Sequence, residues 1–184
     1  AVGGADALRR IETIHTLGVV DGHGVSGDLD EWQTIDGRHR QRIDFQGRWN
    51  VLTVFDGRRG WSVDADGVRH VLRAEDLAGE YSDAWLASLA WLFRERRAGT
   101  LLAEPGGPAS TAGEERLVAR PARGLSVTLV FDTTTGLPLR WETPIAGRTR
   151  VTAPLDWRRV DGVLVPFGSF EFRATNVGSE TVLA

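Results

Sequence analysis

The sequence predicts an α+β domain dominated by antiparallel sheet. Short runs of alternating apolar and polar residues are separated by turn signals, and Asp-Gly occurs at 36–37, 56–57, 66–67 and 161–162. Asp-Gly tolerates the positive φ angles of a tight hairpin, and such short connections leave no room for the crossover helices of a parallel sheet. Two other segments have helical periodicity. We therefore expect about ten antiparallel strands with short helices near the start and the middle.

The chain begins with a helical pattern and then changes period. Asp6 is placed to cap a helix in which Leu8, Ile11 and Ile14 share one face. After Gly18 the pattern becomes that of strands. We predict these strands at 17–25, 29–36, 39–46, 49–56, 60–64 and 68–72.

Two of these strands differ in how they should be buried. His39, Gln41, Ile43 and Phe45 alternate with charged residues, which is typical of a strand with one solvent-facing side. The strand at 49–56 is apolar on both faces instead, so it needs cover on both sides.

The segment 74–97 supplies a candidate for that cover. Its helical pattern is interrupted near Gly79, with Ser82 as a second N-cap and Gly99 as the stop. The second part is apolar on nearly all sides, which predicts a buried helix. Its apolar residues are Trp85, Leu86, Leu89, Trp91, Leu92 and Phe93.

The strand pattern resumes after a loop. Residues 103–113 are rich in glycine and proline, which predicts a flexible loop inside a single domain that spans 1–184. Turns are expected at 133–136 and 146–147. The further strands are predicted at 115–120, 125–131, 137–143, 149–155 and 167–174.

Composition excludes several kinds of chemistry. The chain has no cysteine, and all 22 basic residues are arginine, which excludes disulfides, thiol nucleophiles, cysteine-bound zinc, a P-loop lysine and Schiff-base catalysis. A net charge of −3 gives no electrostatic footprint for nucleic acid. The longest strongly apolar run, 86–93, is too short to span a membrane.

No enzymatic or metal motif is present. His15, His23, His39 and His70 are scattered without ligand spacing, and the Asp-Ala-Asp-Gly at 64–67 lacks the glutamate that ends a calcium loop. Asp132-Thr-Thr has no glycine at the third position and no second copy to complete an aspartic protease dyad. We therefore expect no catalytic residues, no metal and no cofactor. A hydrolase without a local signature is the remaining enzymatic alternative.

Two stretches resemble the LolA/LolB-type periplasmic lipoprotein-carrier superfamily. The first, Val54-Phe-Asp-Gly-Arg-Arg-Gly-Trp-Ser-Val, is similar to the Asp-Gly-x-x-Gly-Trp hairpin of that group and precedes the helical segment. The second begins at Phe131-Asp-Thr-Thr-Thr-Gly-Leu and ends at Asp156-Trp-Arg-Arg-Val-Asp-Gly-Val-Leu-Val-Pro. It is similar to the family's later hairpin and its Asp-x-Arg-x-Val-Asp-Gly-Val-x-x-Pro segment, and the order of elements also matches.

The resemblance implies an open antiparallel half-barrel that curls around short helices and leaves an apolar cleft between the sheet and the central helix. It implies a non-enzymatic periplasmic or otherwise extracytoplasmic bacterial protein, with its signal peptide removed, that carries a lipid or the acyl chain of a lipoprotein between donor and acceptor proteins. The expected apolar lining is Phe45, Trp85, Leu89, Trp91, Leu92, Leu129, Phe131, Trp141, Phe170 and Phe172.

Relatives of this kind also occur as accessory regions of larger secreted proteins, such as retropepsin-like proteases. The chain can therefore also be interpreted as a fragment of a longer secreted protein, in which it docks to a downstream enzyme domain and has a filled core without a ligand.

Overall fold

The computed structural model describes residues 2–22, 24–96, 98–103, 111–177 and 180–183, and its strands form two open antiparallel sheets. The chain divides into two compact units. One is Ile11–Arg96, and the other combines Ala1–Arg10 with Arg97–Ala184. The α+β class with antiparallel sheet is confirmed, with thirteen strands in the described residues rather than about ten.

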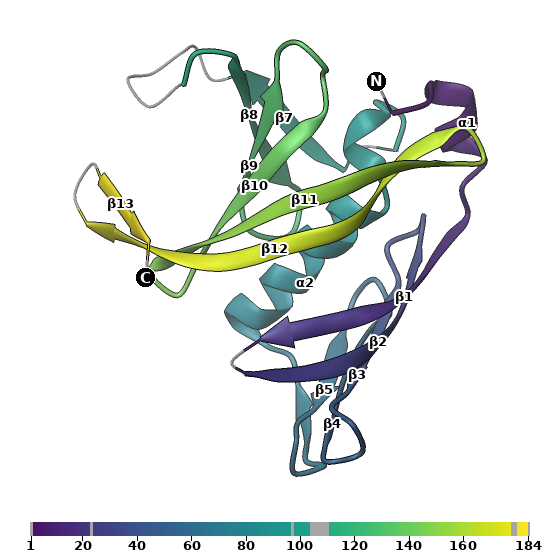
Figure 1. Ribbon diagram of the computed structural model, residues 1–184, viewed down its shortest axis with the longest axis vertical. Coiled ribbons are helices and arrows are strands. Elements are labelled where there is room, and N and C mark those ends of the chain that lie inside the picture. The colour runs from purple at the N-terminus through teal and green to yellow at the C-terminus, as the bar shows by residue number, and fades with distance from the viewer. Residues whose placement is uncertain (1, 23, 97, 104–110, 178–179, 184) are drawn as a thin grey trace. The chain divides into compact units, whose positions relative to one another are not determined.

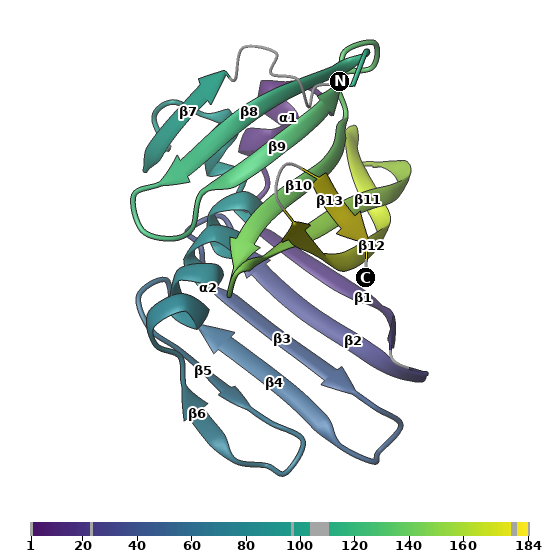
Figure 2. The same ribbon diagram turned by 90° about the vertical axis from the view of Figure 1, so that its left-hand side faces the viewer.

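The unit Ile11–Arg96 contains a six-stranded meander in which each strand pairs with its sequence neighbour (Figure 2). The strands are β1 (Thr13–Gly22), β2 (Val25–Thr34), β3 (His39–Asp44), β4 (Asn50–Phe55), β5 (Gly60–Val63) and β6 (Arg69–Val71). The strand expected at 17–25 is confirmed for 17–22, within β1, but its end is wrong, because the chain reverses between Gly22 and Val25, which pair with each other. Gly24 has φ +78°, which glycine adopts without steric cost, and His23 lies outside the described residues.

The first helix is shorter than its periodicity predicts. Helix α1 covers Ala5–Arg9, its N-cap is Gly4 rather than Asp6, and no side chain caps it. Residues from Thr13 onward belong to β1 instead. The β-branched residues Thr13, Ile14 and Thr16 favour a strand, and pairing with β2 overrides the helical spacing.

The central helix is one continuous segment. Helix α2 covers Ala74–Ala87, and Ser82 lies inside it, where its Oγ donates to the carbonyl oxygen of Ala78 at 3.1 Å. The second N-cap at Ser82 is therefore wrong, as is the extension to 97. Leu89 takes φ +56°, which ends the helix, and a short 3₁₀ turn, η1 (Ala90–Leu92), follows.

Helix α2 packs on one end of the six-stranded sheet. Tyr81 meets Phe55 edge-on with ring centroids 5.0 Å apart, and its hydroxyl donates to the carbonyl of Arg58 at 2.8 Å. Glu80 bonds to His39 at the start of β3. These contacts all lie where β3 starts and β4 ends.

The second unit contains a seven-stranded sheet in the order β13-β12-β11-β10-β9-β8-β7, with β11 and β12 forming its longest hairpin (Figure 1). Its strands are β7 (Gly99–Ala103), β8 (Glu114–Pro121), β9 (Val127–Asp132), β10 (Pro138–Ile145), β11 (Arg148–Val160), β12 (Val163–Val177) and β13 (Glu180–Leu183). Gly99 therefore begins a strand instead of stopping a helix. Residues 104–110 of the expected loop lie outside the described part of the chain.

The tight turns of this sheet match their sequence signals. Ala146 and Gly147 have φ +51° and +73°, and Asp161 and Gly162 have φ +48° and +85°. Positive φ at both central residues is the type I′ geometry that suits the twist of a hairpin. Asp132 Oδ1 accepts bonds from the backbone N–H groups of Thr134 and Thr135, which fixes the predicted turn at 133–136.

Candidate functional site

One face of the six-stranded sheet is divided into rows that run across the strands. The cross-strand register places three rows side by side. The row nearest α2 contains His39 and Phe55, and the next row is polar throughout, with Thr16, Glu31, Gln41, Thr53 and Ser62. Beyond it the face becomes apolar. We call Val20, Leu29, Ile43, Phe45, Trp49 and Val51 the apolar band.

The apolar band is continuous because Gly27, which has no side chain, leaves room for the side chains of Ile43 and Phe45. A Cβ at Gly27 would lie 2.9 Å from both Ile43 Cγ2 and Phe45 Cδ1, so only glycine fits beneath these side chains. The rings of Phe45 and Trp49 contact each other with centroids 5.2 Å apart. All six side chains of the band are half-buried. Part of their apolar surface therefore remains accessible, unlike that of Phe55, which is 2% exposed.

A hollow of about 250 Å³ lies at the corner of the sheet where the apolar band ends. We call it the corner hollow. It is lined by Gly24, Val25, Ser26, Phe45, Gln46, Arg48 and Trp49. Gln46 and Gly47 have φ +54° and +69°, so a type I′ turn presents Arg48 and Trp49 at its rim.

The polar row and α2 are joined by a charged cluster, which we call the His39 clasp. His39 Nε2 lies 3.1 Å from Glu31 Oε1 and His39 Nδ1 lies 3.1 Å from Glu80 Oε2, while Gln41 donates to Glu31 at 3.1 Å. Burial opposes the charged form of His39, but the bonds to Glu31 and Glu80 outweigh it and raise the pKa of His39 to about 9. Burial alone would raise the pKa of Glu31, and the bonds from His39 and Gln41 hold it below its usual range. The clasp therefore holds α2 on the sheet with an imidazolium between two carboxylates.

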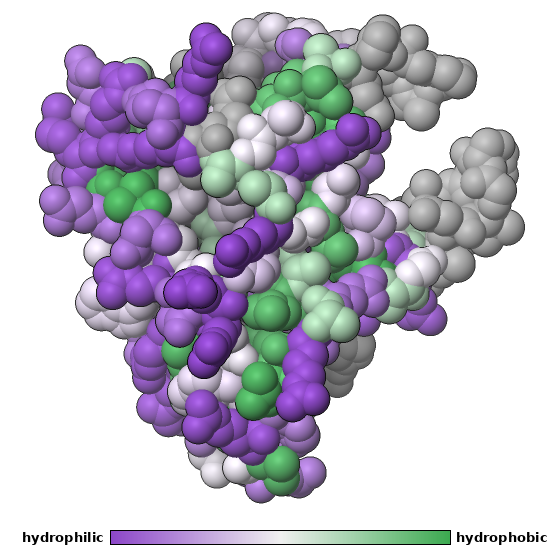
Figure 3. Space-filling view, turned by 180° about the vertical axis from the view of Figure 1, so that it is seen from behind, coloured by the Kyte–Doolittle hydropathy of each residue, from purple (hydrophilic) through white to green (hydrophobic). Residues whose placement is uncertain are grey.

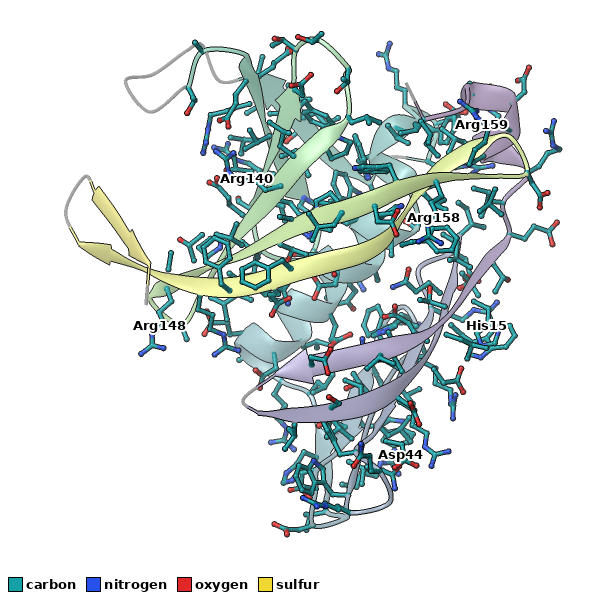
Figure 4. All side chains as sticks on the ribbon, in the orientation of Figure 1. His15, Asp44, Arg140, Arg148, Arg158 and Arg159 are labelled. Atoms are coloured by element: carbon teal, nitrogen blue, oxygen red, sulfur yellow. The ribbon has the colours of Figure 1, made fainter. Side chains whose placement is uncertain are left out.

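The opposite face of this sheet is chemically different. Arg40 and Arg42 alternate with the residues of the clasp and the band along β3, and they pair with Asp30 and Asp44. His15 stacks on the exposed Trp32 with centroids 3.8 Å apart (Figure 4 labels His15 and Asp44). The strand at 49–56 is half-buried on both faces, with Val51 on the band side and Leu52 and Val54 on the arginine side.

Of the lining residues that the sequence predicts, Trp85 lies inside α2, and Leu89, Trp91 and Leu92 lie in the segment that ends it. Trp85 is 8% exposed, and its indole Nε1 has no hydrogen-bond partner among the residues that the structure describes. Trp91 Nε1 donates to the carbonyl of Leu86 at 3.3 Å, which closes the turn after α2. Leu89 and Leu92 are half-buried in that turn. Phe45 lies at the far end of β3 from α2, so the structure does not bring it beside these residues.

The remaining predicted residues lie on two faces of the seven-stranded sheet. Leu129 and Trp141 pair directly, and Trp141 shares its face with Thr152 and Glu171. Phe131 follows Leu129 by two residues on the same strand and so shares this face. Phe170 and Phe172 alternate with Glu171 and point to the opposite side, where Phe170 is 59% exposed. The five residues therefore do not line a single surface.

A lattice of arginine and glutamate covers part of that opposite side. Arg140 makes two bonds to Glu114, at 2.8 and 3.0 Å, and a third to Glu142 at 2.8 Å, while Arg116 bonds to Glu142 at 2.9 Å. The Arg140 guanidinium holds the pKa of Glu114 below its usual range. Val130 pairs with both Arg116 and Arg140 and is fully buried, because the aliphatic stems of such side chains cover apolar surface. Figure 4 labels Arg140 on β10.

Other apolar side chains are exposed elsewhere in the described residues, among them Leu17, Val19 and Phe167. On the face drawn in Figure 3, hydrophobic residues form small groups between hydrophilic ones. Among the residues that the structure describes, no three His, Asp or Glu side chains are grouped so that they could hold a metal ion. In the same residues, no helix is both long and apolar enough to cross a membrane.

Sequence reasoning found Phe45 of this site but missed its neighbours. The sequence pattern places Leu29, Trp49 and Val51 in predicted strands, and only the register shows that they share a face with Ile43 and Phe45. The hairpin signals at both strand ends indicate which residues share this face, since they fix the pairing of the strands.

No known family model matches the chain, and no curated protein matches it either.

Proposed function

We propose that this chain is a non-enzymatic binding protein that takes an acyl chain on the apolar band. The observation that carries the proposal is the division of one sheet face into a clasped end, a polar row and a half-buried apolar band. A surface with so few polar groups offers an alkyl chain burial rather than chemistry. Each methylene that leaves water contributes about 0.8 kcal/mol, so several of them bind without a specific polar contact.

The wider setting follows the resemblance to the LolA/LolB-type carriers. The hairpins that carry the resemblance are β4–β5, β9–β10 and β11–β12. On this proposal the chain is an open half-barrel, resides outside the bacterial cytoplasm, and exchanges a lipid or lipoprotein acyl chain with a partner protein.

A second candidate function is docking to an enzyme domain with a filled core. The close packing of Tyr81 on the buried Phe55 favours it, because the space under α2 is occupied by the chain's own side chains. On this alternative, the apolar band contributes to packing and binds no small molecule.

Calorimetric titration with decanol and decanoate separates the two candidates. We expect binding to the wild-type chain, and a loss of roughly tenfold in affinity for Ile43→Gln, which removes apolar contact from the band. Leu52→Gln is the matched control, because Leu52 is also half-buried in the β3–β4 hairpin but lies on the opposite face. Absence of binding, or equal losses in both variants, contradicts the proposed function.

A further inference from the structure

The corner hollow places a cation at one end of the apolar band. Arg48 is exposed at the rim, next to Phe45 and Trp49. An extended chain that lies along the band from the polar row reaches the hollow after about 14 Å, which is four residues of β3 at 3.4 Å each. On the proposed function, the hollow therefore lies at one end of the surface that takes the alkyl chain.

Arg48 has no anion from its own surroundings. In the part of the chain that the structure describes, no carboxylate lies within ion-pair distance of its guanidinium. Two acids near the hollow have other partners: Asp44 pairs with Arg42 at 3.0 Å and accepts the backbone N–H of Gly47 at 2.9 Å, and Asp21, which faces Ser26 in the β1–β2 pair, accepts the hydroxyl of Ser26. The positive charge at the rim is therefore available to a ligand.

We propose that the corner hollow binds the anionic head group, a carboxylate or a phosphate, of the acyl ligand whose alkyl chain lies on the apolar band. The Arg48 guanidinium donates to the anion in a planar, two-pronged geometry that suits either group. Trp49 and Phe45 cover the first carbons of the chain. This inference rests on the proposed function and adds the chemical class of the ligand and its direction on the sheet.

A matched pair of arginines provides the test. Arg148 also follows a type I′ turn, Ala146–Gly147, and is also exposed, but it belongs to the other sheet (Figure 4). Arg48→Gln and Arg148→Gln change the net charge equally. Both are titrated with decanoate, decyl phosphate and decanol, together with Arg48→Lys, and thermal unfolding checks that each variant is folded.

We expect Arg48→Gln to weaken decanoate or decyl phosphate by roughly tenfold or more, as the loss of a charged hydrogen bond implies, and to leave decanol unchanged. Arg48→Lys should retain part of the affinity, and Arg148→Gln all of it. Comparison of the affinities for decanoate and decyl phosphate shows whether the site prefers a carboxylate or a phosphate head group. If decanol binds the wild type as tightly as both anions, or if Arg48→Gln weakens decanol equally, the inference is overturned while the acyl site stands. If no alkyl compound binds, the proposed function fails first.

Discussion

The His39 clasp makes the stability of the chain depend on pH in a defined window. His39 is 12% exposed and lies between Glu31 and Glu80. Its pKa rises from 6.5 to about 9 on folding. At about 1.4 kcal/mol per pH unit, this difference stabilises the folded chain by up to roughly 3 kcal/mol.

The sign of the effect follows from the raised pKa. The contribution is fully present below pH 6.5, where His39 is charged in both states, and is lost as the pH rises from 6.5 through about 9. Glu31 acts in the opposite direction, because its pKa is lowered on folding. Its contribution is present above its usual pKa of 4.5 and is lost as the pH falls through the lower folded value.

Urea unfolding of the wild type and of His39→Gln between pH 5 and pH 10 measures the contribution. The variant should be less stable at pH 6, and the difference between the two proteins should shrink by up to roughly 3 kcal/mol by pH 10. His70→Gln is the control, because His70 is 54% exposed and bonds only one carboxylate, Asp64, in the described residues. A His39→Gln difference that stays constant with pH refutes the account of the clasp.

Three further substitutions test the geometry. Gly27→Ala should destabilise the chain by about 1–3 kcal/mol, because the alanine Cβ would lie 2.9 Å from Ile43 and Phe45. Urea unfolding that shows no loss of stability would contradict the tight packing beneath the band. Ala146→Gly should raise the free energy of unfolding by up to about 1 kcal/mol, since φ +51° is costly for alanine, and a lower unfolding midpoint would speak against the assigned turn. Arg140→Gln should cost about 1–3 kcal/mol at pH 7, because it removes the arginine that bonds twice to the half-buried Glu114 and leaves Glu142 paired with Arg116 alone. A loss that persists unchanged at pH 3 would show that ion pairing is not the cause.

Much of the fold follows from local sequence signals. Asp36-Gly37, Asp56-Gly57, Asp66-Gly67 and Asp161-Gly162 all lie at reversals, and the glycine of each pair has a positive φ. In two of these turns a carboxylate also accepts backbone N–H groups: Asp56 from Arg58 and Arg59, and Asp64 from Asp66 and Val68. The alternation of 39–45 also predicts the burial of β3 correctly.

The errors lie where a tertiary contact decides between two local options. Ser82 satisfies its hydroxyl inside α2 rather than capping a helix, and Thr13 to Thr16 join β2 because a partner strand is available. Intrinsic helix and strand propensities alone do not predict these two results.

The candidate site was harder to predict than the fold. Alternation tells which residues of one strand share a face, but not which face of the next strand joins them. Trp141 and Phe172 were grouped by hydrophobicity, and the register places them on opposite sides. Arg48 carries no sequence signal among 22 arginines, since its availability depends on Asp44 pairing with Arg42.

Photo-crosslinking tests the central claim most directly, because it reports where an acyl chain lies. The folded chain is labelled with a decanoate analogue that bears a diazirine on its alkyl chain, and the modified peptides are mapped by mass spectrometry with unlabelled decanoate as competitor. We predict competitor-sensitive labels on the peptide that contains Ile43, Trp49 and Val51. Labels confined to other segments, such as that of Phe170 and Phe172, or labels that decanoate does not displace, would contradict the assignment of the apolar band as the binding site.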